Sequence, residues 1–229
     1  MTDIHTSDSR AKWEFIFLIL TGTLHILIKE ISLFMKWDTE SLYGPGFIGN
    51  MGFVVLWVGY VIYRIKENPG ILKEWGFRLD NFKQSGNVAL MFGLPASFLL
   101  LGYGTGWKGY RYPFSSLALI LFLYPLWGLA QQSALQVFAN RNLKIMGLPL
   151  VYRLPLVASL FSLSHFRNYA LMILVFPLGV VGSWIYEKKP NLWVLAILHG
   201  ILGMLTYFFI LGEDPGTPLI LVIRRFFQW

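Results

Sequence analysis

The 229-residue chain contains no cysteine, which excludes disulfide bridges, thiolate metal sites and cysteine nucleophiles. Charged residues are also scarce: they make up 14% of the chain, against about a quarter in an ordinary soluble domain. Acidic residues are the scarcer kind, with 12 Asp and Glu against 19 Lys and Arg. The motifs Gly-x-Ser-x-Gly and His-Glu-x-x-His do not occur, so the hydrolase sites that they mark are excluded.

Hydrophobic residues dominate what is present, at 55% of the chain, with a mean hydropathy of +0.56. Much of such a chain faces lipid, and no polar linker separates two segments that could fold alone, so we expect one membrane-embedded unit. The net charge of +7 comes from basic residues in short clusters between apolar runs. This pattern is typical of membrane loops. The expected partner is therefore the lipid bilayer and not a nucleic acid.

Seven apolar stretches are candidate membrane spans, since a helix needs about 20 residues to cross the hydrocarbon core. They cover residues 15–35, 47–64, 87–105, 114–139, 154–165, 169–187 and 192–211. The region 154–187 is too long for one untilted helix and too short for two full spans with a loop. We therefore predict an all-α polytopic bundle of about seven spans, broken near 162–169.

The distribution of basic residues predicts the orientation of these spans. If 154–187 crosses twice, one side of the membrane holds twelve Lys and Arg and the other holds four: Lys36, Lys108, Arg111 and Arg167. The positive-inside rule makes the richer side cytoplasmic, together with the N-terminus. The predicted segments are a polar cytoplasmic tail at 1–12, N-terminal helices with an amphipathic loop at 13–112, a core at 113–211 and an interfacial tail at 212–229.

Polar side chains inside the spans are the candidate functional residues. At about 1.5 Å per helical residue, Gln131, Gln132 and His199 lie roughly 12 Å from the cytoplasmic end of their helices, and His165 roughly 16 Å. Three separate helices thus place amides and imidazoles in one layer. The competing interpretation for each residue is a plain hydrogen bond between helices.

Three short motifs resemble those of one family of membrane enzymes. They are "QQSALQ" (131–136), "FSLSH" (161–165) and "LHGILG" (198–203). Their order resembles the CPBP family of CAAX-prenyl-protease-like and bacteriocin-processing intramembrane endopeptidases, over roughly residues 70–210. That family carries Glu-Glu-x-x-x-Arg, then Phe-x-x-x-His, then His-x-x-x-Asn or Asp. The resemblance implies that Phe161, His165 and His199 are matching site residues.

The remaining motif positions depart from the family pattern. Gln131 and Gln132 stand where the family has its two glutamates, Gln136 where it has arginine, and Gly203 where it has Asn or Asp. The family chemistry implies a glutamate that activates water, with histidines and the Asn stabilising an oxyanion or ligating a metal. A carboxamide cannot serve as a general base, and Gly203 lacks a donor for an oxyanion.

Three functions follow as hypotheses. The first is a non-hydrolytic homologue that binds a peptide or transmembrane segment in a polar cavity. The alternative is an active intramembrane endopeptidase that uses His165 or His199 as base. The third is a small-solute transporter, because broken helices often line transport sites. We expect no cofactor, since two glutamines remove the anionic ligands that would help His165 and His199 hold a divalent metal.

Overall fold

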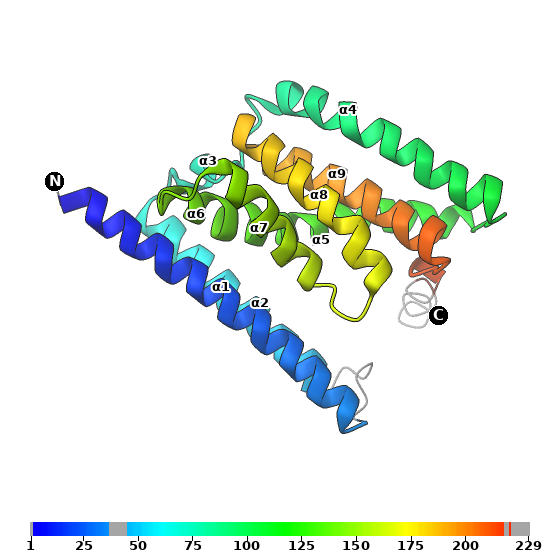
Figure 1. The fold of residues 1–229 in the computed structure, drawn as a ribbon, viewed down its shortest axis with the longest axis horizontal. Coiled ribbons are helices and arrows are strands. Elements are labelled where there is room, and N and C mark those ends of the chain that lie inside the picture. The colour runs from blue at the N-terminus through cyan, green and yellow to red at the C-terminus, as the bar shows by residue number, and fades with distance from the viewer. Residues whose placement is uncertain (1, 37–44, 218–219, 221–229) are drawn as a thin grey trace, which may run out of the picture. The chain divides into compact units, whose positions relative to one another are not determined.

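The computed structural model describes residues 2–36, 45–217 and 220. Within these residues the chain is helical and contains no strand. The α-helices are α1 (Thr2–Phe34), α2 (Pro45–Glu67), α3 (Ile71–Glu74), α4 (Phe82–Leu101), α5 (Phe114–Gln132), α6 (Asn142–Ile145), α7 (Leu150–Leu163), α8 (Tyr169–Lys188) and α9 (Leu192–Thr206) (Figure 1). Three further segments are π-helical: η1 (Gly102–Trp107), η2 (Ser133–Arg141) and η3 (Tyr207–Leu211). The predicted all-α class is confirmed.

Five helical segments among the described residues are long and apolar enough to cross a membrane. They are Asp8–Phe34, Phe82–Trp107, Phe114–Ile145, Tyr169–Lys188 and Leu192–Leu211. Helix α7 is apolar but has only 14 residues, fewer than the roughly 17 needed for the shortest spans. The chain therefore has the character of a multi-pass membrane protein. The count of seven spans is not confirmed, and the cytoplasmic N-terminus stays a prediction.

The predicted break near 162–169 is present. Helix α7 ends at Leu163 and α8 begins at Tyr169. In the turn between them Arg167 has a φ of 74°, a left-handed conformation that is uncommon for residues other than glycine. The Arg167 side chain is paired with Glu30 of α1, and Ser162 Oγ donates to the Met172 carbonyl at 2.8 Å. These contacts hold the turn against the neighbouring helices.

The chain divides into two compact units that interleave along the sequence. Unit 1 contains residues 1–75 and 134–180, and unit 2 contains residues 76–133 and 181–229. The predicted segments at 1–12, 13–112 and 113–211 stay predictions, although α1 already begins at Thr2. Most of the predicted interfacial tail, 212–229, lies outside the described residues.

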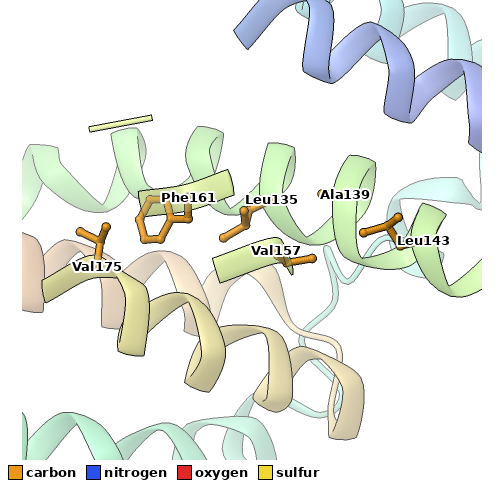
Figure 2. Close-up of a cluster of buried hydrophobic side chains, with 6 residues drawn as sticks. All are labelled: Leu135, Ala139, Leu143, Val157, Phe161 and Val175. Atoms are coloured by element: carbon orange, nitrogen blue, oxygen red, sulfur yellow. The ribbon is translucent and has the colours of Figure 1, made fainter. Parts of the chain in front are cut away.

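Each unit has its own apolar core. In unit 1, the cluster in Figure 2 packs η2 and α6 against α7 and α8. Its residues are Leu135, Ala139, Leu143, Val157, Phe161 and Val175. The first three residues recur every four positions, so they share one helical face. Also in unit 1, α1 and α2 run side by side (Figure 1). In unit 2, Ile120 of α5 packs with Met204 and Leu205 of α9 and with Phe208 and Phe209 of η3.

Candidate functional site

Gln132 and His199, two of the predicted site residues, meet inside unit 2. Gln132 is the last residue of α5, and His199 lies in the middle of α9. Gln132 Nε2 is 3.1 Å from His199 Nδ1. The two residues are only 1% and 5% exposed. Because buried polar groups are costly unless they are hydrogen-bonded, this bond explains how an amide and an imidazole are accommodated in an apolar helix pair.

The bond requires a close approach of α5 to α9, and Gly128 permits it. Gly128 precedes Gln132 by four residues, so both lie on the same face of α5. A Cβ on Gly128 would be 3.0 Å from the Ala196 carbonyl oxygen and 3.3 Å from His199 Cβ. A larger residue would therefore require α9 to move away by a few tenths of an ångström. Small residues at helix contacts serve the same purpose in other membrane bundles.

The hydrogen bond sets the position of the imidazole proton. An amide nitrogen can only donate, so His199 Nδ1 is the acceptor of the bond from Gln132 Nε2. A neutral imidazole that accepts at Nδ1 carries its proton on Nε2. In this tautomer Nε2 is a hydrogen-bond donor and not a proton acceptor.

Gly203 lies one turn beyond His199, and its side of α9 is filled by Tyr124. A Cβ on Gly203 would be 2.4 Å from Tyr124 Cε1. The Tyr124 ring lies 6.4 Å from the His199 ring, and its hydroxyl is hydrogen-bonded to that of Tyr207. The tyrosine ring therefore takes the space that an Asn or Asp side chain would need at position 203.

Asn191 fixes the start of the helix that carries His199. Its Oδ1 accepts from the Val194 backbone N–H at 3.0 Å, which is a standard N-cap. Its Nδ2 donates to the Arg78 carbonyl at 2.7 Å and to Asn81 Oδ1 at 2.8 Å. Gly76, with a φ of 95°, presents its carbonyl to the Leu192 N–H at 2.9 Å. The loop before α4 thus anchors α9.

Phe161 and His165, the second motif, lie in unit 1. Their rings are 5.2 Å apart, and Phe161 is part of the unit 1 core (Figure 2). His165 Nδ1 is 3.0 Å from the Phe161 carbonyl oxygen and 3.1 Å from Ser164 Oγ. Because a carbonyl can only accept, Nδ1 carries the proton and Nε2 is the acceptor nitrogen. His165 therefore has the opposite tautomer to His199.

Gln136, the position of the family arginine, is also in unit 1 and is fully buried. Its Oε1 accepts from Asn140 Nδ2 at 3.1 Å along the π-helical segment η2. Gln131 is half-buried. The predicted site residues thus fall into two groups. Gln131, Gln132, His199 and Gly203 belong to unit 2, and Gln136, Phe161 and His165 belong to unit 1.

The sequence did not single out Gly128, Tyr124 or Tyr207. The nearest signal for Gly128 is its four-residue spacing from Gln132, which places a small residue on the site face. Nothing in the residue pattern points from Tyr124 to Gly203, because that contact depends on how two helices pack. Among the described residues no three His, Asp or Glu side chains gather in a metal-binding group; the expectation of no cofactor stays a prediction.

Comparison with protein-family models, curated proteins and solved structures finds no match for this chain. The likeness to the CPBP family therefore depends on the three motifs alone.

Proposed function

We propose that the chain is a membrane protein with a CPBP-like helical core that binds a peptide or transmembrane segment without hydrolysing it. The observation that carries this proposal is the buried pair of Gln132 and His199. The pair joins the first and third motifs, where the family combines a carboxylate with an imidazole. Here it combines a carboxamide with an imidazole.

This pair is suited to binding and not to proton abstraction. A carboxamide does not accept a proton at any ordinary pH, so Gln132 cannot activate water. The bond that Gln132 makes holds the proton of His199 on Nε2. The imidazole is therefore a hydrogen-bond donor at Nε2 and not a general base.

The surroundings of Gly203 also favour binding without hydrolysis. In acyl-transfer sites, removing one oxyanion donor typically costs about 10²–10³ in rate. At position 203 the space for such a donor contains the Tyr124 ring, and the Tyr124 hydroxyl is bonded to Tyr207. Restoring an Asn at this position would require the ring to move.

One observation favours the alternative, an active endopeptidase. His165 carries its proton on Nδ1, which leaves Nε2 as a nitrogen able to accept a proton from water. This mechanism predicts that the wild type, with Gln131 unchanged, cleaves its substrate and that His165→Ala abolishes cleavage.

The proposal is tested by peptide binding to the purified chain in lipid bilayers. We expect fluorescent transmembrane peptides to bind the wild type, and His199→Ala to weaken binding about fivefold, the equivalent of one buried hydrogen bond. Gln84→Leu on α4 is the control, because Gln84 is exposed and outside the site. Equal binding by the wild type and His199→Ala, or no binding by the wild type, would contradict the proposal.

A further inference from the structure

A cavity of about 200 Å³ lies within unit 1 at the contact of α1, α2, η2 and α6. Its lining consists of Arg10, Ala11, Glu14, Arg64, Arg141, Asn142 and Ile145. We call it the arginine cavity, after Arg10, Arg64 and Arg141 in its lining. At roughly 30 Å³ per water molecule in the liquid, it has room for a small anion. We infer that it binds a phosphate group, either on a lipid headgroup or as free phosphate.

The single carboxylate in the lining, Glu14, is already fully engaged. Its Oε1 accepts from Arg64 Nη1 and from the Tyr60 hydroxyl, the latter at 2.6 Å. Its Oε2 accepts from Asn142 Nδ2 at 2.8 Å. Both oxygens therefore have donors from the protein, and one guanidinium balances the charge of Glu14. A ligand in the cavity meets the remaining positive charge.

Arg10 and Arg141 supply that remaining charge, and both have side chains that solvent reaches, 46% and 26% exposed. Arg10 Nη1 is 2.9 Å from Glu67 Oε2, and Arg141 Nη2 is 3.6 Å from Glu74 Oε2. The second distance is too long for a hydrogen bond. Exposed ion pairs of this kind contribute little, so an incoming anion can replace these carboxylates.

The charge of the lining favours phosphate over a carboxylate. Three guanidinium groups and one carboxylate give the lining a net charge of +2. A phosphate monoester carries about −1.5 to −2 near pH 7, whereas a carboxylate carries −1. Guanidinium groups also present paired N–H donors that match phosphate oxygens in a bidentate arrangement.

Arg64 is held in place before any ligand arrives. Its side chain is 9% exposed, and its Cζ lies 5.8 Å from the Trp75 ring and 6.0 Å from the Tyr60 ring. Its Nε is buried without a hydrogen-bond acceptor, 3.5 Å from Glu67 Oε2. A buried N–H without an acceptor is costly, and a phosphate oxygen has the acceptor chemistry that Nε lacks. Holding Arg64 in advance lowers the entropy cost of binding.

The predicted orientation indicates which phosphate the cavity meets. Arg10, Arg64 and Arg141 all belong to the basic residues assigned to the cytoplasmic side. Basic pockets between membrane helices on that side bind anionic lipid headgroups. Both sources share the phosphate group, so the test includes one arm for each.

The experiment uses the full chain in phosphatidylcholine nanodiscs. One arm titrates inorganic phosphate; the other adds phosphatidic acid, with the diester phosphatidylglycerol as comparison. We expect saturable binding of phosphatidic acid over phosphatidylglycerol, weakened about tenfold by Arg141→Gln, the loss of one charge-assisted contact. Saturable binding of inorganic phosphate with the same dependence on Arg141 assigns the site to the phosphate group alone.

Matched variants separate the cavity from general surface charge. Lys144→Gln removes the same charge from an exposed residue outside the lining, and we expect it to change the affinity by less than about twofold. Glu74→Gln should strengthen binding, because it removes a competitor for Arg141. If Arg141→Gln does not fold by circular dichroism and gel filtration, Arg10→Gln on α1 replaces it. The inference is overturned if neither phosphate source binds, or if the arginine variant and Lys144→Gln have the same affinity.

Discussion

Replacing Gly203 by alanine tests whether the Tyr124 ring determines the packing beside α9. The new Cβ would lie 2.4 Å from Tyr124 Cε1 and 3.1 Å from Cδ1. Carbon atoms pack best at roughly 3.5–4.0 Å, so the ring or the helix must shift by about 1 Å. Because overpacking of this kind costs about 1–3 kcal/mol, we expect Gly203→Ala to lower the free energy of unfolding by that amount.

The assay is reversible denaturant unfolding of the purified protein in detergent, followed by circular dichroism. Gly86→Ala on α4 is the matched control, because a Cβ there meets no atom within 4 Å. That substitution should leave the stability unchanged or raise it by up to about 1 kcal/mol, since alanine favours the helix. The two glycines thus have opposite expected signs.

A double-mutant cycle with Tyr124→Ala isolates the contact. Without the ring, the Cβ at position 203 meets no clash from Tyr124, so the cost of Gly203→Ala should vanish. The expected coupling is about 1–3 kcal/mol, in the range found for residues in contact. An equal cost of Gly203→Ala with and without Tyr124 would show that the Tyr124 ring does not determine the packing beside Gly203.

Two further predictions concern buried polar contacts, one within unit 1 and one within unit 2. Glu14→Gln keeps the size of the side chain but leaves buried Arg64 with the longer ion pair of its Nε to Glu67 Oε2, at 3.5 Å. We therefore expect a loss of about 3 kcal/mol in unfolding free energy, at the low end for a broken buried ion pair; a loss below about 1 kcal/mol would contradict this role. Asn191→Ala removes the N-cap of α9 and its bonds to the preceding loop, with an expected loss of about 1–2 kcal/mol. The control Asn87→Ala, on the exposed surface of α4, should leave the free energy of unfolding nearly unchanged. Equal losses for the two substitutions would count against the role of Asn191 as N-cap.

Much of the helical framework was predictable because the length of an apolar run determines whether a helix can cross lipid. All seven predicted stretches overlap helical segments, two of them running one or two residues past a helix end, and the break near 162–169 occurs between α7 and α8. The three π-helical segments were not predicted, since the i→i+5 bonding pattern leaves no hydrophobic period of its own. The interleaving of two units also depends on long-range packing that hydropathy does not report.

The candidate site was predictable in part. Depth along the helices placed Gln132 and His199 in one layer, and in the structure their side chains are in contact; their role in a site stays a prediction. The shared layer with His165 stays a prediction, because His165 belongs to the other unit. The basic residues served only to predict orientation, and nothing in their spacing indicated that Arg10, Arg64 and Arg141 line one cavity. Side chains from three distant segments meet only through the packing of α1.

Whether the wild-type chain hydrolyses transmembrane peptides decides between binding without hydrolysis and an active endopeptidase. The measurement is mass spectrometry of peptide products after incubation with the protein in lipid bilayers, with His165→Ala measured in parallel. Since Gln131 and Gln132 cannot act as bases and His199 accepts at Nδ1, we predict bound peptide and no cleavage by either protein. Products that form with the wild type and disappear in His165→Ala would contradict the account and establish an active endopeptidase.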